Sequence, residues 1–317
     1  MKVLVPKAYR GKLPKIDDAE IVIIDQRVPV PKEHLDAEVL VAWGQPPEVL
    51  RDSAERLTKL RLVQAFLAGP DPVVAAGFAQ EVPISSGVGL HDGPVAEHAL
   101  ALILALLRHL PLAVQNAERH VWDVKHAGSM KERADDGRVT TLDGANVTIW
   151  GYGSIGSTLA PHISLLGGNV TGAARTAGVR GGVTVVDDAG LADVLAETDV
   201  LVMILPTHPS TAKAMDAQRF AQLKEGAVLV NVGRGNTVDE KALVAALESG
   251  RLAGAAIDVT EVEPLPAGSP LWDLPNLLIT PHIAGGRPQN ADKLLAHNIA
   301  AVRAGGEVRN LVRVTGR

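Results

Sequence analysis

The sequence predicts an α/β protein built from two doubly wound domains, each with a parallel sheet. Short apolar runs alternate with helix-like stretches almost throughout the chain, as expected when parallel strands are joined by crossover helices. Hydrophobic residues make up 46% of the chain but aromatic residues only 3%, so the core must consist mainly of aliphatic side chains, which suits buried parallel strands. At about 150 residues per domain, a length of 317 residues indicates two domains.

The first third of the chain contains the strands of a small doubly wound domain. Polar helical stretches, such as residues 46–57, lie between these apolar runs. The predicted strands cover residues 2–6, 20–25, 38–43, 60–66 and 82–86.

A helix over residues 93–111 is predicted next, and a second strand series follows it. Pro94 suits the first turn of this helix, Pro111 is expected to end it, and its apolar surface indicates burial between layers. A closing helix is predicted over residues 289–304. The second series of strands is predicted at residues 146–150, 169–173, 183–186, 199–205, 227–232, 254–259 and 276–281.

Composition excludes several classes of function. The net charge of −5 gives no general attraction to nucleic acid or to an anionic membrane surface. Because the chain has no cysteine, it has no disulfide, thiolate nucleophile or Cys-ligated zinc. The ten histidines show no metal-ligand spacing, and the most apolar run, residues 99–107, is too short to span a bilayer. We therefore expect a cytoplasmic protein without a metal.

A glycine-rich turn predicts a site for a dinucleotide. Gly151, Gly153 and Gly156 directly follow a predicted strand and open a predicted helix. The first glycine permits the tight turn, the second lets the backbone approach a pyrophosphate, and the third lets helix and strand pack closely. The N-terminus of the helix then offers free N–H groups to the phosphates.

The next strand lacks the acidic residue that usually binds the ribose 2′-hydroxyl of NAD. Its end carries Ala174, Arg175 and Thr176, with Arg180 close by, and the first acidic residue after Gly151 is Asp187. Arg175 can pair with a 2′-phosphate and Thr176 can donate to it, which favours NADP. A solvated Arg175 with indifferent cofactor choice leaves NAD open as the alternative.

Three polar residues follow successive predicted strands in the second series. Arg234 lies in a Gly-Arg-Gly turn, Glu263 precedes Pro264, and His282 follows Pro281. Open α/β sheets bind ligands at the carboxyl ends of their strands, so these side chains are expected beside the glycine turn. Histidine can exchange a proton near neutral pH, a carboxylate can orient its ring, and an arginine can bind a carboxylate. This set predicts reversible reduction of a 2-oxo acid by a nicotinamide cofactor.

At these residues the chain resembles the D-isomer specific 2-hydroxyacid dehydrogenase family over nearly its whole length. The resemblance implies a discontinuous flavodoxin-like substrate domain, residues 1–93 plus 287–317, around a Rossmann domain at residues 94–286. It also implies a homodimer, in which Trp122 would reach the partner subunit. The motifs that carry it are GPVAEHALALILALLR, GYGSIG, LPTHPST, LVNVGRGNTVDEKALVAAL, GAAIDVTEVEPLP and LWDLPNLLITPHIAG.

The resemblance assigns roles to residues in these motifs. His282 would be the proton donor, Glu263 its partner and Arg234 the substrate anchor, while Glu261 is expected to be a bystander. The N–H groups of Ala68 and Gly69 would hold the substrate carboxylate, although Pro70 removes one donor that relatives often have. The implied cofactor contacts are Gly151, Gly153, Ser154, Ile155, Gly156, Arg175, Thr176, Leu205, Pro206, Thr211, Val232, Gly233, Asp258 and Gly285, with Asp258 accepting from the nicotinamide carboxamide.

Several functions remain open at this stage. A reductase of glyoxylate, hydroxypyruvate or a bulkier 2-oxo acid is favoured over a dinucleotide-sensing corepressor, because a sensor has no need of all three catalytic residues. A phosphoglycerate dehydrogenase is a further alternative. Glu263 argues against a formate dehydrogenase, and the segment around His282 argues against a methyltransferase. His91 and Asp92 lie where the domains are expected to join, and there packing or helix capping is favoured over ligand contact.

Overall fold

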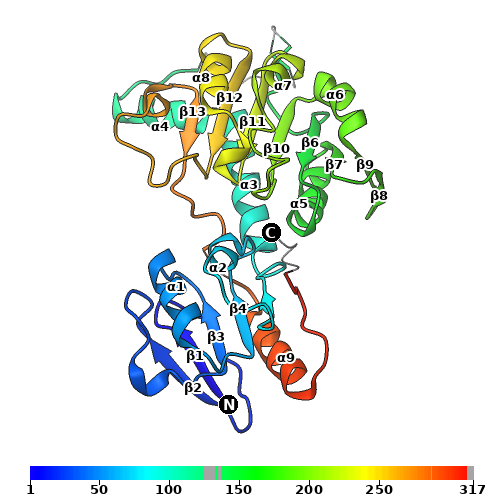
Figure 1. Ribbon diagram of the computed structural model, residues 1–317. Helices are drawn as coiled ribbons and strands as arrows, with labels where there is room; N and C mark the ends of the chain where they lie inside the picture. Colours follow the sequence, from blue (N-terminus) through cyan, green and yellow to red (C-terminus); the bar gives the residue numbers. More distant parts are fainter. Residues whose placement is uncertain (125–132, 135–136, 287, 313–317) are drawn as a thin grey trace. The chain divides into compact units, whose positions relative to one another are not determined.

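The computed structural model describes residues 1–124, 133–134, 137–286 and 288–312, and it divides into two compact units (Figure 1). One unit comprises Met1–His91 with Gly286–Arg317, and the other comprises Asp92–Gly285. The sequence placed the corresponding limits after residues 93 and 286. Both units are parallel sheets flanked by helices, so the predicted fold class is confirmed.

In the first unit, the described residues form a five-stranded parallel sheet in the order β2-β1-β3-β4-β5. Every strand predicted in this third of the chain is present; the first has the predicted bounds and the other four are shorter. Leu4, Leu40 and Leu62 are fully buried on these strands, as expected for strands that are covered on both faces. The strands are β1 (Lys2–Pro6), β2 (Glu20–Ile24), β3 (Val39–Ala42), β4 (Leu62–Ala65) and β5 (Ile84–Ser85).

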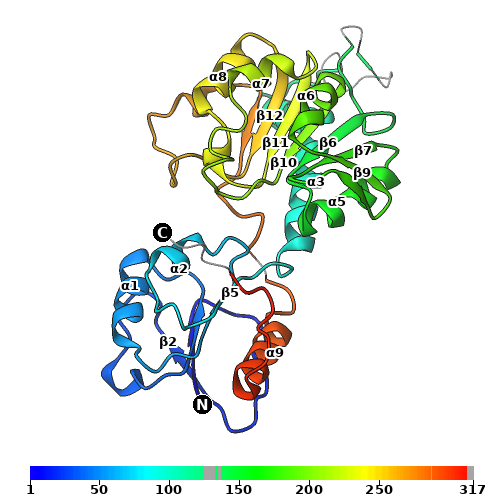
Figure 2. The same ribbon diagram turned by 45° about the vertical axis from the view of Figure 1, so that its right-hand side comes forward.

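Helix α9 near the end of the chain belongs to this first unit, as Figure 2 shows. Asn298 on α9 is fully buried, and its Nδ2 donates to Gln64 Oε1 at 2.8 Å and to Ser85 Oγ at 3.0 Å. These polar contacts fix α9 against β4 and β5. The helices of this unit are η1 (Lys32–His34), α1 (Pro47–Arg56), α2 (Asp71–Ala75) and α9 (Ala291–Ala304).

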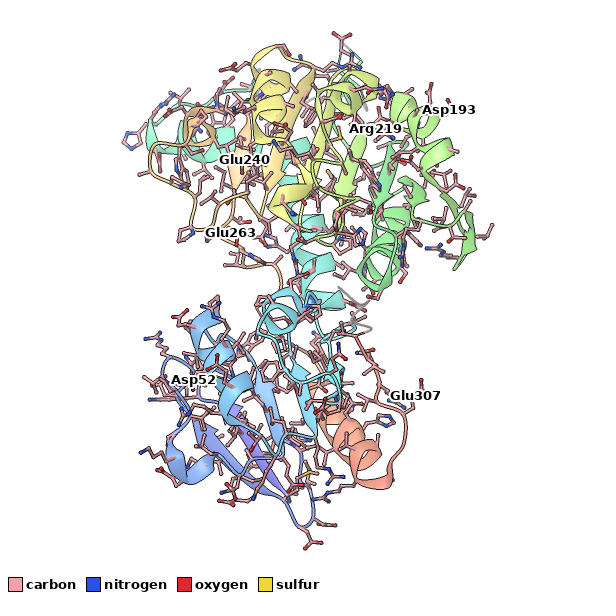
Figure 3. The ribbon with its side chains drawn as sticks, in the orientation of Figure 1. Asp52, Asp193, Arg219, Glu240, Glu263 and Glu307 are labelled. Atoms are coloured by element: carbon pink, nitrogen blue, oxygen red, sulfur yellow. The ribbon has the colours of Figure 1, made fainter. Side chains whose placement is uncertain are left out.

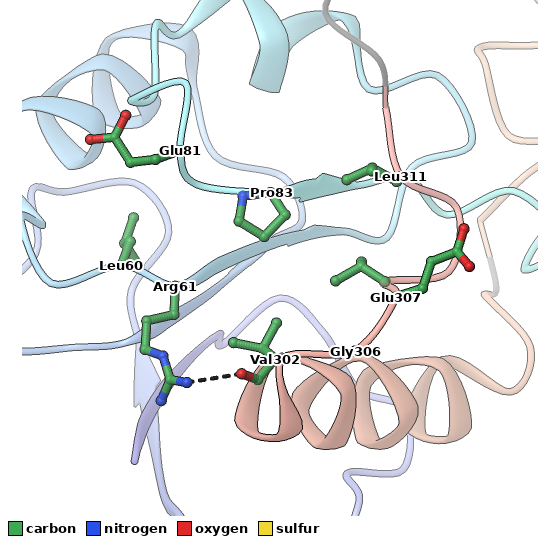
Figure 4. Close-up of a pocket in the computed structure, with 10 residues that line it drawn as sticks. Leu60, Arg61, Glu81, Pro83, Val302, Gly306, Glu307 and Leu311 are labelled. Carbon is green, nitrogen blue, oxygen red and sulfur yellow. Dashed lines mark hydrogen bonds between the residues drawn. The ribbon is translucent and has the colours of Figure 1, made fainter.

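A cavity of about 530 Å³ lies between the start of β4 and the end of α9 (Figure 4). Arg61 donates across it to the Val302 carbonyl at 2.9 Å, which satisfies one of the carbonyl groups at the end of the helix. Apolar side chains such as Pro83 and Leu311 form part of its lining. The cavity therefore marks where the end of α9 meets the sheet.

The second unit contains an eight-stranded sheet within its described residues, in the order β13-β12-β11-β10-β6-β7-β9-β8. All strands are parallel except β8, which pairs antiparallel with β9 and was not predicted. The chain adds β7 and β9 on one side of β6 and then returns to add β10 on the other side. The end of β6 is thus the point where the strand order reverses, and ligands bind at such points. The strands are β6 (Asn146–Trp150), β7 (Asn169–Ala173), β8 (Gly178–Arg180), β9 (Val183–Val186), β10 (Val200–Met203), β11 (Ala227–Asn231), β12 (Leu252–Ile257) and β13 (Leu277–Ile279).

The single helix predicted over residues 93–111 is in fact two helices, which meet at a 65° bend. The first ends at Leu107, His109 adopts a left-handed backbone with φ of 52°, and Pro111 lies in the first turn of the second helix. Pro111 starts a helix because the first turn needs no N–H from it. The helices of this unit are α3 (Asp92–Leu107), α4 (Leu110–Glu118), α5 (Ser154–Leu165), α6 (Asp188–Glu197), α7 (Ala217–Gln222), η2 (Gly235–Thr237), α8 (Glu240–Glu248) and η3 (Pro270–Asp273).

Helix α3 packs beside α5 against the sheet, and the two views of the ribbon agree on this (Figures 1 and 2). Ala99 and Ile103 of α3 are fully buried in the same core cluster as Leu159 of α5. Among the described residues, no single helix has the length and apolar composition to cross a bilayer. Only the bent pair of α3 and α4, taken together, has both.

A buried carboxylate ties together the amino-terminal side of this sheet. Asp199, 3% exposed, binds Arg133 at 2.7 Å and Lys224 at 2.6 Å and accepts from the Asn146 N–H at 2.9 Å. Burial acts to raise the pKa of Asp199, but its two cationic partners and the Asn146 N–H outweigh burial and lower that pKa to about 2.

Candidate active site

The glycine turn lies where the strand order of the second sheet reverses. Steric contacts require glycine at two of its positions. Gly151 has φ of +100°, and a Cβ there would lie 2.5 Å from the Ile204 carbonyl oxygen. Gly156 packs against β6, since a Cβ there would lie 3.1 Å from an Ile149 methyl group. Two of the three glycines therefore play the parts that the sequence assigned to them, the tight turn and the close packing of helix on strand.

The turn leads into the N-terminus of α5, which has N–H groups to offer. Gly153 is its N-cap residue, and the first helical hydrogen bond runs from the Ser157 N–H to the Gly153 carbonyl at 2.9 Å. The N–H groups of Ser154, Ile155 and Gly156 precede that bond and have no helical partner. A pyrophosphate fits here, because these groups and the positive end of the helix dipole favour an anion.

The segment after β7 carries the residues predicted to select the cofactor. Arg175 and Thr176 are both exposed. Arg180 on β8 donates to the Thr176 carbonyl at 2.6 Å and to the Tyr152 carbonyl of the glycine turn at 3.0 Å. Arg180 thus joins this segment to the glycine turn. Sequence reasoning noted Arg180 only as a neighbour, because nothing in the local pattern indicates contacts with two carbonyl groups.

His282 and Glu263 form a direct pair in the loops that follow β12 and β13. His282 Nδ1 lies 2.7 Å from Glu263 Oε2, and the side chains are 49% and 39% exposed. The Thr260 N–H donates to the other carboxylate oxygen of Glu263 at 3.2 Å. Figure 3 shows Glu263 on the loop after β12. The predicted pair is therefore in contact, and it is open to solvent.

Asp258 supports the backbone on which His282 lies. Its carboxylate, 1% exposed, accepts from the Ile283 N–H at 3.0 Å, from the Ala284 N–H at 3.0 Å and from Thr280 Oγ1 at 2.6 Å. His282 itself has φ of +53°, a left-handed conformation that costs free energy in a non-glycine residue. The bonds to Asp258 offset that cost. The predicted contact of Asp258 with a nicotinamide stays a prediction.

His98 on α3 reaches the same loop, since its Nε2 lies 3.0 Å from Thr280 Oγ1. Glu261, by contrast, faces Lys213 at 3.8 Å, and its N–H donates to Glu240 at 2.7 Å. Its carboxylate therefore has a partner other than His282, as the bystander interpretation requires.

Arg234 is connected to the His282 pair through a close backbone contact. A Cβ on Gly233 would lie 2.7 Å from the Leu205 nitrogen, and one on Gly235 would overlap Thr260, whose N–H holds Glu263. Glycines on both sides of Arg234 thus bring the ends of β10, β11 and β12 together. The Arg234 guanidinium donates to the Gly233 carbonyl at 2.8 Å.

The remaining predicted cofactor contacts lie on or near this edge of the second unit. Leu205 and Val232 are buried at the ends of β10 and β11, whereas Pro206 is exposed. Thr211 Oγ1 donates to the Pro206 carbonyl at 2.7 Å, so it fixes the loop after β10. Gly285 is the last residue of this unit.

Ala68 and Gly69 belong to the first unit, in the loop between β4 and α2. Among the described residues, neither of their N–H groups has a hydrogen-bond partner. The Gly87 N–H donates to the Leu67 carbonyl at 2.7 Å, and His91 Nε2 lies 2.6 Å from the Phe66 carbonyl oxygen. The loop is therefore fixed by hydrogen bonds to its Phe66 and Leu67 carbonyl groups, while the N–H groups of Ala68 and Gly69 are available as donors.

In the part of the chain that the structure describes, no group of three or more His, Asp or Glu side chains could hold a metal ion.

Comparison with known proteins identifies the family. The model of the "D-isomer specific 2-hydroxyacid dehydrogenase, NAD binding domain" matches residues 100–284. A D-3-phosphoglycerate dehydrogenase of Haemophilus influenzae is 35% identical over 255 residues, which are 76% of this chain but only 57% of that protein.

Solved structures of similar fold match nearly the whole chain. A D-isomer specific 2-hydroxyacid dehydrogenase from Xanthobacter autotrophicus, in complex with NADPH and MES, is 30% identical with a TM-score of 0.80, and the match covers 98% of this chain and 97% of that one. An NADPH-dependent glyoxylate/hydroxypyruvate reductase from Sinorhizobium meliloti, in complex with NADP and sulfate, is 27% identical with a TM-score of 0.79 and 98% coverage of both chains. The chain therefore belongs to the D-isomer specific 2-hydroxyacid dehydrogenase family, whose members are oxidoreductases that use a nicotinamide dinucleotide.

Proposed function

We propose that this protein reduces a small 2-oxo acid, of the glyoxylate or hydroxypyruvate type, to a D-2-hydroxy acid, and that it prefers NADPH to NADH. The observation that carries this proposal is the 2.7 Å contact between His282 and Glu263 in the unit that also contains the glycine turn. A proton donor and an anion site on one sheet are what carbonyl reduction by a dinucleotide requires.

A bound nicotinamide dinucleotide supplies the hydride that adds to the carbonyl carbon. The carbonyl oxygen then needs a proton, and His282 is the group that gives it. Since a carboxylate only accepts, Nδ1 of His282 carries the hydrogen that points to Glu263. This leaves Nε2 to exchange the proton with the substrate, and Glu263 fixes the orientation of the ring.

We assign substrate binding to the positive charge of Arg234 and to backbone N–H groups. Arg234 would pair with the carboxylate of the 2-oxo acid, because a guanidinium binds a carboxylate through two parallel hydrogen bonds. The N–H groups of Ala68 and Gly69, in the first unit, are the backbone donors proposed for a substrate carboxylate. Pro70 offers no N–H, which limits this part of the site to two donors.

The preference for NADPH is supported by the residues after β7. Ala174 stands where an acidic residue would repel a 2′-phosphate, and Arg175 beside it is exposed. Two of the solved relatives contain NADPH or NADP. NAD remains the alternative cofactor.

Two other functions stand as alternatives. A dinucleotide-sensing corepressor has no need of a paired His282 and Glu263, so their contact favours the enzyme. A phosphoglycerate dehydrogenase is supported by the 35% identity to the H. influenzae enzyme, but the match covers little more than half of that enzyme.

We also propose that two copies of the chain associate through the region of α4. Leu110, Val114 and Val121 are 50%, 61% and 50% exposed, and Trp122 is 93% exposed. Apolar side chains gathered along one segment are typical of a protein interface. A mass measurement in solution tests the dimer, and Val114→Asp should shift it to the monomer mass.

We place the protein in the cytoplasm, with which the lack of cysteine is compatible.

A spectrophotometric panel tests the activity. Loss of NADPH and of NADH absorbance is followed with glyoxylate, hydroxypyruvate, pyruvate, phenylpyruvate and branched-chain 2-oxo acids. Turnover that favours NADPH with a small 2-oxo acid is expected. Dinucleotide binding without turnover of any substrate would instead support the sensor.

A further inference from the structure

Asp92 places a carboxylate at the point where the glycine turn enters α5. It is the first residue of α3, and Ser154 is the first residue of α5. Ser154 Oγ donates to Asp92 Oδ1 at 3.1 Å. The two helices pack side by side, so their N-terminal ends meet at this contact (Figures 1 and 2).

The partners of this negative charge are a hydroxyl group and a helix dipole. Among the described residues, no lysine, arginine or histidine forms an ion pair with Asp92. What stabilises the carboxylate is the Ser154 hydroxyl together with the positive dipole end of α3. Asp92 therefore places its negative charge beside the end of α5 through the Ser154 hydroxyl.

A pyrophosphate at the N–H groups of Ser154 and Ile155 brings two more negative charges to the same place. An oxygen bound to the Ser154 N–H would lie within about one Debye length, 8–10 Å, of Asp92, where exposed charges still repel each other. The repulsion acts on the part of the cofactor that NADH and NADPH share. The repulsion therefore lowers the affinity for NADH and for NADPH equally and leaves the preference between them unchanged.

We propose that Asp92 is an affinity-limiting residue, whose carboxylate weakens dinucleotide binding and speeds dinucleotide release. The inference rests on the proposed use of a nicotinamide dinucleotide at the glycine turn. It extends that proposal by assigning a residue that holds the affinity for the cofactor below what the helix end could provide. Release of the product dinucleotide limits turnover in many enzymes, and in such an enzyme a looser site turns over faster.

The test compares dissociation constants and release rates of NADH and NADPH for the full-length wild-type protein and for Asp92→Asn. Asparagine keeps a side-chain oxygen for the Ser154 hydroxyl and is a good residue at a helix N-terminus, but it carries no charge. At low salt, both dinucleotides should bind Asp92→Asn about threefold to tenfold more tightly and leave it more slowly, and the gain should shrink as salt is added. Asp92→Ser serves as a second uncharged variant.

Two control variants separate the local charge from other causes. Glu97→Gln removes one charge from an exposed position on the same helix and should leave both dissociation constants unchanged. Ser154→Ala breaks the hydrogen bond but keeps the carboxylate, so it should not tighten binding.

Equal or weaker binding by both Asp92 variants would overturn the inference, as would an equal gain in Glu97→Gln. If the wild-type protein binds neither dinucleotide, the proposed function fails and this inference fails with it. Wild-type binding without a gain in the variants overturns the inference alone.

Discussion

Residues that the sequence singled out for chemistry depend on supporting contacts that the sequence does not reveal. The pairing of Glu263 with His282 could be predicted, because both follow strands whose carboxyl ends meet at one edge of the sheet. The support by Asp258 could not, since it depends on where the Ile283 and Ala284 N–H groups point after the chain has folded. The bridge made by Arg180 was missed for the same reason.

The choice of cofactor depends on Arg175. Arg175→Ala should weaken NADPH binding about tenfold or more and leave NADH binding nearly unchanged, because a charge-assisted hydrogen bond contributes about 1.5–3 kcal/mol. Dissociation constants from fluorescence titration measure this. Arg27→Ala, at an exposed position of the other unit, is the control. Equal losses for both dinucleotides would remove the 2′-phosphate interpretation.

Most strands could be predicted from the runs of apolar residues, and the two departures described above have local causes. The break after Leu107 was missed because Pro111 is compatible with either the end or the start of a helix. The strand β8 was missed because its three residues are too few to show an alternation. The loop between β4 and α2 is positioned by contacts that no periodicity reveals.

His91 holds that loop from within the first unit. Its Nε2 donates to the Phe66 carbonyl at 2.6 Å, and its ring stacks on Trp43 with centroids 5.9 Å apart. His91→Phe keeps the stacking but leaves the buried carbonyl without its donor, at a cost of about 1–3 kcal/mol. We expect this variant to raise the KM for the 2-oxo acid about tenfold while kcat changes little.

His91→Gln is the matched variant, because its side-chain amide can donate to the same carbonyl. Its KM should lie closer to that of the wild-type protein. If His91→Phe lowers kcat and leaves KM unchanged, His91 does not position the substrate loop.

The stability of the whole molecule should depend on pH through Asp199. The pKa of Asp199 is lowered to about 2 in the folded protein, against roughly 3.9 in an unfolded chain. The unfolded state therefore binds more protons between these values, and stability falls as the pH decreases. The contribution is complete above roughly pH 5, amounts to about 2 kcal/mol, and is mostly lost by about pH 2.

Unfolding of the wild-type protein and of Asp199→Asn at several pH values measures this contribution. The gap between their free energies of unfolding should narrow by about 2 kcal/mol between roughly pH 5 and 2. A gap that stays constant over this range would mean that the ion pairs with Arg133 and Lys224 do not lower the pKa.

We propose that His282 gives the proton to a 2-oxo acid while a dinucleotide is bound at the glycine turn. The most direct test is the maximal rate of NADPH oxidation by His282→Ala with the best 2-oxo acid, measured alongside NADPH binding. The rate should fall about 100-fold or more, the usual contribution of a general acid, while the dissociation constant for NADPH stays near the wild-type value. A variant that keeps the full rate would contradict the claim.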